Sequence, residues 1–231
     1  MGSSRLPGKV LLPLGARSVL AEVLDRCAAI PGADLVVCAV PDEHSSDPVA
    51  AEAAACGAMV YRGPEADVLA RYLGAARAAG AEVVMRITSD CPLIDPALCG
   101  QLLALRAAEG ADYAANNLEP GLPHGLDCEA FTTTALAEAA AATDAPYDRE
   151  HVTPWLRRAP HLRRASLPPP TRAHADERWT LDHPEDYAFI RGLFEAAGNR
   201  LGRSMAETLA LCDRNPELRA LNAKWRRDAE N

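Results

Sequence analysis

The sequence predicts an α/β protein with a mainly parallel sheet, because short apolar runs alternate with amphipathic segments through its first two thirds. The chain has 231 residues, of which 48% are hydrophobic and 24% are charged, so it can bury one sizeable core. We find no internal repeat and no linker of distinct composition. We therefore expect a single domain over residues 1–231, with a C-terminal helical extension from about residue 184.

The predicted elements follow from hydrophobic spacing and from glycine and proline breaks. Apolar residues at helical spacing predict a first helix at 19–27, with Glu22, Asp25 and Arg26 on its polar face. Short apolar runs that end at turn residues predict the strands. The other helices are expected at 46–56, 64–80, 135–142 and 149–157 and again from residue 184, and the strands at 35–40, 58–61, 82–88, 112–116, 126–131, 162–167 and 178–181.

Charge and cysteine usage exclude several classes of protein. Lys+Arg total 24 against Asp+Glu 32, a net charge of −8 without a basic block, which argues against nucleic acid as the main partner. The seven cysteines are scattered and never spaced as Cys-x-x-Cys, so we expect reduced thiols rather than disulfides or a zinc site. No signal-peptide-like or membrane-spanning apolar stretch occurs. We expect a soluble, cytoplasmic protein.

Two aspartates follow predicted strands. Asp90 comes after the strand at 82–88, and Asp182 comes after the strand at 178–181. Ligands of open α/β sheets bind at the carboxyl ends of the strands, and Mg²⁺ prefers a few carboxylate oxygens together with phosphates and water. The two aspartates are therefore candidate metal ligands. The competing interpretation is that each one caps the helix that follows it.

The segment Gly2-Ser3-Ser4-Arg5-Leu6-Pro7-Gly8-Lys9 combines small residues with two cations, a composition that suits an anion. It is not a Walker A loop, because five residues separate its glycines and Val10 follows the lysine. From composition alone, a phosphate-binding loop and an N-terminal tail without a ligand remain alternatives.

The segment from Gly2 to Leu11 resembles the nucleotide-binding loop of the cytidylyltransferases that activate acidic sugars. The resemblance points to the spore coat polysaccharide biosynthesis protein F branch, which is similar to CMP-KDO synthetase and acylneuraminate cytidylyltransferase. It extends in order over nearly the whole chain. The further matching segments are Arg86–Asp95, Leu122–Glu129, Arg149–Pro154, Arg178–Asp186 and Asn215–Leu218.

The resemblance implies a Rossmann-like nucleotidyltransferase fold and transfer of CMP from CTP to a sugar hydroxyl, with release of pyrophosphate. It implies that Arg5 and Lys9 hold the triphosphate beside the backbone of Gly2, Ser3 and Ser4. It also implies that Asp90 and Asp182 carry Mg²⁺. Such a transfer depends on positioning and on neutralising phosphate charge.

The resemblance also assigns an acceptor side. His124, Asp127, Glu150 and His151 would face the sugar, although His151 and Glu150 also suit an ordinary first helical turn. Arg86 lies within an apolar strand, so it must either contact a phosphate or sugar or pair with a carboxylate such as Asp95.

One departure concerns the start of the sheet. In the family, a hydrophobic strand precedes the loop, whereas this sequence begins one residue before it. We expect the sheet to lack this inner strand and to leave a groove between its neighbours. A truncated record and a degenerate paralogue are the two explanations, and the intact downstream segments favour truncation.

Other functions remain open. A sugar-1-phosphate nucleotidyltransferase or a glycosyltransferase of related fold is one alternative, although no Asp-x-Asp occurs in the chain. A nucleotide- or sugar-binding module without catalysis is another. Members of the family are often homodimers, so the resemblance also suggests a possible second copy as partner.

Overall fold

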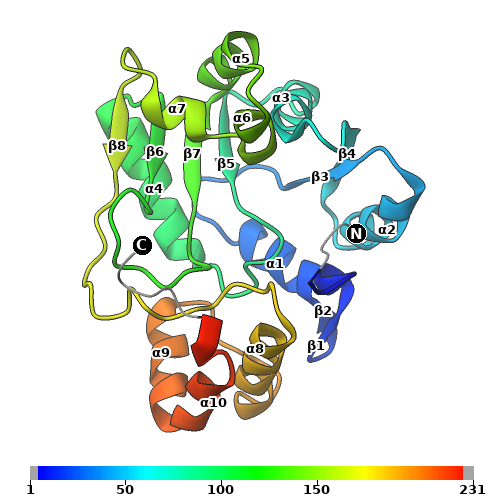
Figure 1. Cartoon of the computed structure of the whole chain (residues 1–231), viewed down its shortest axis with the longest axis vertical. Helices are drawn as coiled ribbons and strands as arrows, with labels where there is room; N and C mark the ends of the chain where they lie inside the picture. The colour runs from blue at the N-terminus through cyan, green and yellow to red at the C-terminus, as the bar shows by residue number, and fades with distance from the viewer. Residues whose placement is uncertain (1–4, 226–231) are drawn as a thin grey trace.

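The strands lie in a hairpin and two sheets over residues 5–225, the part of the chain that this computed structural model describes (Figure 1). The strands are β1 (Pro13–Leu14), β2 (Arg17–Ser18), β3 (Val37–Pro41), β4 (Met59–Gly63), β5 (Val83–Arg86), β6 (Tyr113–Ala115), β7 (Glu129–Thr132) and β8 (Arg164–Ser166). The helices are α1 (Val19–Ala28), α2 (Asp47–Ala55), α3 (Val68–Ala78), α4 (Pro96–Glu109), α5 (Thr133–Ala142), α6 (Pro146–His151), α7 (Pro154–Arg158), α8 (Pro184–Ala196), α9 (Met205–Arg214) and α10 (Pro216–Leu221), with 3-10 turns at Lys9–Leu11, His44–Ser46 and Ala223–Trp225.

The α/β class is confirmed, but the sheets are mixed rather than mainly parallel. β3 and β4 pair in parallel, as do β6 and β8, whereas β7 runs antiparallel to both β5 and β6. Parallel neighbours need a long crossover, usually a helix. The connection from β6 to β7 contains no helix among the described residues, so β7 returns in the opposite direction.

Most predicted helices and strands are present, with shifted ends. The third helix begins at Val68 behind the N-cap Asp67, four residues later than the proline at 64 suggested. The helix expected at 149–157 is divided into α6 and α7 because Val152 adopts a left-handed backbone, with φ of 70°. The strand expected at 178–181 is reduced to a single bridge between Arg178 and His124.

The first helix corrects one detail of the prediction. Its Ser18 N-cap accepts a hydrogen bond from the amide of Ala21, and its apolar face is buried as expected. Arg26, however, is fully buried instead of facing water. Its guanidinium donates to Glu22 at 2.8 Å and to the backbone carbonyls of Ile94, Gly202 and Arg203. A buried arginine needs such partners, and here it ties α1 to the segment ahead of α9.

The C-terminal helices share an apolar core with earlier parts of the chain. Trp179 is fully buried and packs in one cluster with Leu14 and Leu93 and with Phe189 and Ile190 of α8. These helices form the lower part of the molecule, beneath the sheet (Figure 1). None of the helices among residues 5–225 combines the length and apolarity needed to cross a bilayer.

The close approach of Gly125 to the segment after residue 177 generates a stability prediction. Gly125 has φ of +116°, and a Cβ there would lie 2.6 Å from the carbonyl carbon of Trp179. We expect Gly125→Ala to lower the free energy of unfolding by about 2–4 kcal/mol, because backbone strain and overlap add. Gly57→Ala is the matched control, since φ is +82° with nothing within 4 Å, and should cost only about 1–2 kcal/mol. Urea denaturation measures both, and equal losses would contradict the close approach.

Candidate active site

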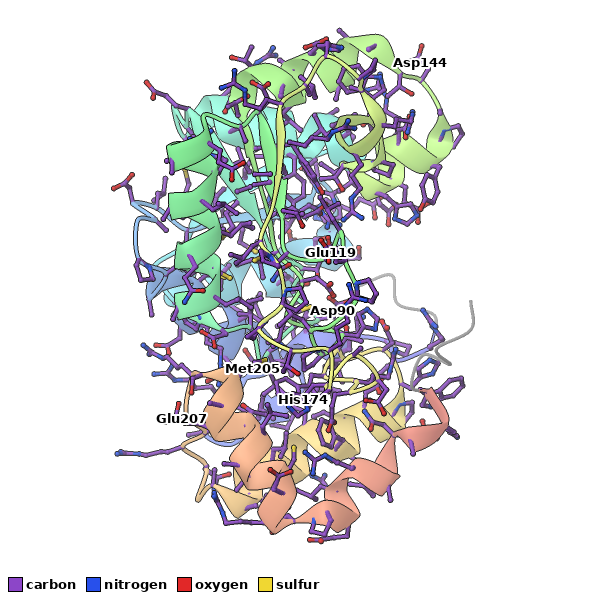
Figure 2. The ribbon with its side chains drawn as sticks, turned by 90° about the vertical axis from the view of Figure 1, so that its left-hand side faces the viewer. Asp90, Glu119, Asp144, His174, Met205 and Glu207 are labelled. Carbon is purple, nitrogen blue, oxygen red and sulfur yellow. The ribbon has the colours of Figure 1, made fainter. Side chains whose placement is uncertain are left out.

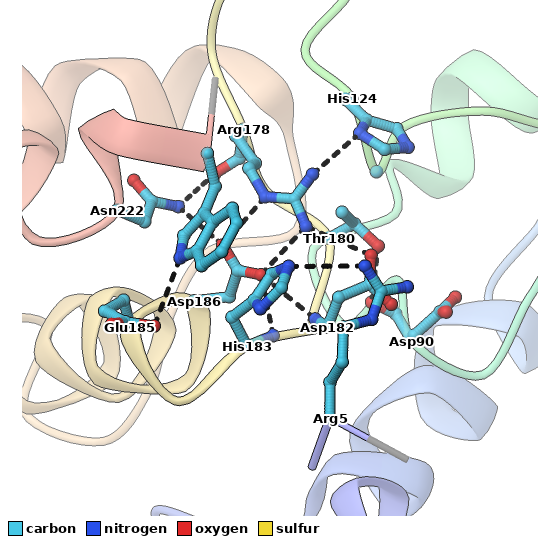
Figure 3. Close-up of polar contacts among 12 residues, drawn as sticks. Arg5, Asp90, His124, Arg178, Thr180, Asp182, His183, Glu185, Asp186 and Asn222 are labelled. Carbon is cyan, nitrogen blue, oxygen red and sulfur yellow. Dashed lines mark hydrogen bonds and ion pairs between the residues drawn. The ribbon is translucent and has the colours of Figure 1, made fainter. Parts of the chain in front are cut away.

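Asp90 and Asp182, 92 residues apart in sequence, meet at the ammonium group of Lys9. The Nζ atom lies 3.0 Å from Oδ2 of Asp90 and 2.9 Å from Oδ1 of Asp182. The three side chains are only partly exposed, with side-chain exposures of 14% for Lys9, 26% for Asp90 and 21% for Asp182. Figure 3 shows the two carboxylates side by side near Arg5. The fold therefore gathers the candidate metal ligands and the candidate phosphate-binding lysine at one place.

Backbone hydrogen bonds bring these segments together. The amide of Leu181 donates to the carbonyl of Asp90 at 2.8 Å. The amide of Trp179 donates to the carbonyl of His124 at 2.7 Å, so the loop that carries His124 is joined to the segment that leads to Asp182. Because main-chain bonds set these positions, the two aspartates are held near each other independently of their own side-chain contacts.

The capping interpretation of the two aspartates is wrong. The N-cap of α4 is Asp95, whose Oδ1 accepts from the amides of Ala97 and Leu98. The N-cap of α8 is His183. Asp90 and Asp182 each lie ahead of the capping residue, so their carboxylates are available for the contact with Lys9 instead.

Electrostatics keep this group ionised. Burial lowers the pKa of Lys9, but the two carboxylates raise it by more, so its pKa lies above the ordinary value. Burial likewise raises the pKa of Asp182, while Lys9 and Arg178 lower it by more. At neutral pH the lysine is a cation between carboxylates, and Asp182 is an anion.

A further carboxylate, that of Asp186, holds the residues around Asp182 in place. Asp186 is fully buried and binds Arg178 through two bonds of 2.9 Å, to Nε and Nη2. It also accepts the amides of Asp182 and His183 at 3.0 Å. Arg178 in turn donates from Nη2 to Oδ2 of Asp182 at 3.0 Å. A charge buried to this extent is tolerated because each oxygen has several donors.

The C-terminal extension completes this network. Nδ2 of Asn222 donates to Oδ1 of Asp186 at 3.1 Å and to the carbonyl of Arg178 at 2.9 Å. The indole of Trp225 stacks on the ring of His183, with centroids 3.6 Å apart, and its Nε1 donates to Glu185. Figure 3 shows Asn222, Glu185 and His183 around Asp186. Residues that follow α10 therefore support a site formed by the sheet and its loops.

Arg86 has a partner that the sequence did not indicate. Its guanidinium donates to Glu129 at 2.9 Å, whereas Asp95, the carboxylate suggested from sequence, caps α4. Glu129 is 2% exposed and also accepts from Arg157 and from the hydroxyl of Tyr113. Burial raises the pKa of Glu129, but the two arginines lower it by more.

The remaining predicted residues divide into two groups. Arg5, His124 and Asp127 lie in the loops around the aspartates: Nη1 of Arg5 is 3.4 Å from Nε2 of His183, and Nδ1 of His124 is 3.4 Å from Nη1 of Arg178. Oδ2 of Asp127 accepts from the amide of Gly125. Gly2, Ser3 and Ser4 lie outside the described residues.

Glu150 and His151 are placed elsewhere. Both are exposed and belong to α6, which packs against α3, and the ring of His151 contacts that of Tyr147 at 4.4 Å between centroids. Asp144, which just precedes α6, lies at the top of the molecule in Figure 2, whereas Asp90 lies near its middle. Among the described contacts, neither Glu150 nor His151 touches Asp90 or Asp182, and their place at the acceptor stays a prediction.

Sequence reasoning missed Arg178, Asp186, Asn222 and Glu129 as parts of the site. The sequence could have indicated Arg178, because an arginine within an apolar run needs a charged partner and acids follow it at positions 182 and 186. Nothing in the sequence indicated Asn222, because its contact with Asp186 depends on how α10 packs against α8.

An α/β fold that gathers two carboxylates and a lysine in the loops beyond its strands has the location and the residue types of a site for phosphates and a divalent cation. The comparisons identify the family. The chain belongs to the cytidylyltransferase family, whose model matches residues 1–212, and it is therefore a nucleotidyltransferase.

Individual relatives agree with this assignment. The spore coat polysaccharide biosynthesis protein SpsF of Bacillus subtilis (strain 168) is 34% identical over 94% of this chain and 92% of that protein. A 3-deoxy-manno-octulosonate cytidylyltransferase of Anaeromyxobacter dehalogenans (strain 2CP-C) is 27% identical over 97% and 86%. The solved structure of a cytidylyltransferase from Leptospira borgpetersenii serovar Hardjo-bovis (strain JB197) superposes with a TM-score of 0.87 at 28% identity, covering 94% and 92%.

The Asp186 network yields a prediction. We expect Asp186→Asn to lower the free energy of unfolding by about 3–5 kcal/mol, because it removes the buried carboxylate that binds Arg178 through two bonds and leaves only the part-exposed Asp182 as its anionic partner. Glu195→Gln on the same helix is the control: its pair with Arg191 is exposed, and its loss should stay within about 0.5 kcal/mol. Urea denaturation followed by circular dichroism compares the two variants. Similar stabilities would show that Asp186 does not carry this network.

Proposed function

We propose that this protein transfers CMP from CTP to a hydroxyl of an acidic sugar with the help of Mg²⁺, in the biosynthesis of a surface or spore coat polysaccharide. The sugar oxygen forms a bond to the α-phosphorus, the bond from that phosphorus to the β-phosphate oxygen breaks, and the hydroxyl proton passes to solvent. The spore coat and octulosonate relatives support the substrate class. The observation that carries the proposal is the meeting of Asp90, Asp182 and Lys9.

The residues at this place suit a hard divalent cation. Asp90 and Asp182 already hold one cation, the ammonium of Lys9, between their oxygens. Among residues 5–225, no group of three or more histidine, cysteine or acidic side chains is arranged to hold a metal ion, so we propose Asp90 and Asp182 as the two protein ligands. Mg²⁺ is typically bound in this way, by one or two carboxylates together with substrate phosphates and water. When bound, Mg²⁺ would neutralise charge on the triphosphate and on the leaving pyrophosphate.

We assign the triphosphate to Lys9 and Arg5, with the backbone of Gly2, Ser3 and Ser4 beside it. Lys9 is a mobile point charge with a pKa above its ordinary value, and Arg5 is an exposed planar donor within reach of His183. Both suit phosphate oxygens. Arg178 and Asp186 touch neither reactant in this proposal, and they orient Asp182.

We place the acceptor sugar on the side of His124 and Asp127. His124 lies within hydrogen-bond reach of Arg178, and Asp127 is close enough to raise the pKa of the buried Cys91 thiol, after the larger effects of burial and Asp90. Arg86 would contribute its positive charge from the Glu129 cluster. Glu150 and His151 remain proposed acceptor contacts to which we assign no step. We propose the cytoplasm as the site of action.

Pyrophosphate release from CTP with a panel of 2-keto-3-deoxy sugar acids tests this function. We expect Asp90→Asn and Asp182→Asn each to lower kcat/KM at least 100-fold, because each change removes an anion from the proposed metal site. Asp144→Asn is the control, since that side chain is fully exposed on another part of the surface, and it should retain normal turnover. No release with any member of the panel from the folded chain would contradict the proposal.

Replacement of Lys9 should change metal affinity and turnover in opposite directions. In Lys9→Met the two carboxylates lose their internal cation, so we expect the variant to bind Mn²⁺ at least fivefold more tightly in the absence of nucleotide. Its turnover should fall because the triphosphate loses a partner. Electron paramagnetic resonance titration measures free Mn²⁺, and Lys224→Met is the control at the second lysine, which pairs with Glu185. Weaker Mn²⁺ binding by Lys9→Met would show that the ammonium does not compete for this place.

A further inference from the structure

The 3-10 turn that ends at Trp225 packs against the first turn of α8, directly after the aspartate pair. Just before this turn, Nδ2 of Asn222 donates to Oδ1 of Asp186 at 3.1 Å. Within it, Nζ of Lys224 lies 2.6 Å from Oε1 of Glu185, and Nε1 of Trp225 donates to Oε2 of Glu185 at 3.1 Å. The C-terminal extension is therefore tied to the start of α8 through several side chains in a row.

The ring of Trp225 also covers the ring of His183. The centroids of the indole and the imidazole are 3.6 Å apart, and the two planes differ by 5°. The backbone of His183 is fixed, because this residue is the N-cap of α8 and its amide donates to Oδ2 of Asp186 at 3.0 Å. Its remaining freedom is the rotation of the side chain. An indole that lies flat on the imidazole restricts this rotation, so Trp225 sets the plane of the ring.

The edge of the same imidazole faces Arg5. Nη1 of Arg5 lies 3.4 Å from Nε2 of His183, and Figure 3 shows the arginine side chain reaching this ring close to Asp182. A guanidinium can only donate, so Nε2 is the acceptor in this contact. Donation from a cation draws electron density out of the imidazole, and an electron-poor ring stacks more strongly on an electron-rich indole. The contact with Arg5 and the stack on Trp225 therefore support each other.

Arg5 is an exposed side chain whose position needs such support. Among residues 5–225, its guanidinium pairs with no carboxylate. A free arginine loses rotamer entropy when it binds a phosphate, and a side chain that is already ordered loses less. The guanidinium has five N–H donors, so one contact with His183 leaves the others for phosphate oxygens.

We propose that Trp225 is a positioning residue for the triphosphate: it holds the ring of His183, and this ring holds Arg5 where phosphate oxygens bind. The inference rests on the proposed function, which assigns the triphosphate to Arg5 and Lys9. Trp225 itself touches no reactant. The competing interpretation is a purely structural clasp, in which the stack only fastens the extension to α8 and phosphate affinity does not depend on it.

Binding of inorganic tripolyphosphate to the full chain, measured by calorimetry with EDTA present, tests this without catalysis or metal. We expect Trp225→Leu to weaken binding about fivefold, because Arg5 loses the ring contact that orders it. Trp225→Phe should restore the affinity to within about twofold, since phenylalanine keeps a flat ring on His183 and loses only the hydrogen bond to Glu185. Leu221→Ala is the matched control: it trims another exposed apolar side chain of the extension and should leave the affinity unchanged.

A double-mutant cycle shows whether Trp225 acts through Arg5. In an Arg5→Gln background, Trp225→Leu should change tripolyphosphate affinity by less than about 1.5-fold, because the group that it positions is gone. A His183→Asn background should give the same result, since asparagine keeps a capping side chain and removes the ring. Urea denaturation checks that every variant is folded. An undiminished effect of Trp225→Leu in either background would overturn the proposal.

Turnover supplies an independent readout. In pyrophosphate release, Trp225→Leu should raise the KM for CTP about fivefold and leave kcat within about twofold, because the lost contact orders a binding group and not a reacting atom. A clasp that only stabilises the fold would leave the KM of the folded protein unchanged.

Three results of the binding experiment would overturn the proposal: unchanged affinity in Trp225→Leu, no rescue by Trp225→Phe, or higher affinity in Trp225→Leu. The last would show that the stack withholds Arg5 from phosphate. A failure to release pyrophosphate with any sugar would contradict the proposed function and leave these binding results in place. No binding of tripolyphosphate by the unchanged chain would contradict both this inference and the assignment of the triphosphate to Arg5.

Discussion

The site depends on one electrostatic constraint: two carboxylates held a few ångströms apart require a cation between them. The main-chain bond from Leu181 to Asp90 keeps the two segments adjacent, so a cation between the carboxylates relieves their repulsion. Lys9 satisfies this requirement through contacts of 3.0 and 2.9 Å, and it comes from the same loop that would hold a triphosphate. The ammonium group of Lys9 that stabilises the two carboxylates is thus also the cation whose place between them a metal ion bound to the nucleotide would take.

The support for this pair comes from the far end of the chain. Asp186 accepts hydrogen bonds from Arg178, from two backbone amides and from Asn222. Arg178 in turn donates a hydrogen bond to Asp182 and so helps to fix its position. The C-terminal extension is therefore connected to the site by buried polar contacts as well as by the apolar core that α8 and α9 share with Trp179. The family model ends at residue 212 and does not include Asn222, yet this residue belongs to the network.

The divided sheet and the site are adjacent parts of one structure. β5 leads through Thr88 and Ser89 to Asp90, and its edge borders a cavity that Lys9 also lines. The loops that carry the aspartate pair therefore continue directly from the edge of this sheet.

The sequence by itself determined the alternation of helices and strands, because hydrophobic periodicity and glycine and proline breaks are local properties. It also made Asp90, Asp182 and Lys9 candidates, but from the residues alone helix capping and a tail without a ligand remained alternatives, and the resemblance to the family chose between them. Only the tertiary structure decided the antiparallel course of β7, the pairing of Arg86 with Glu129, and the role of Asn222 beside Asp186. These depend on which distant segments become neighbours, and burial of a charge selects its partner only after the chain has folded.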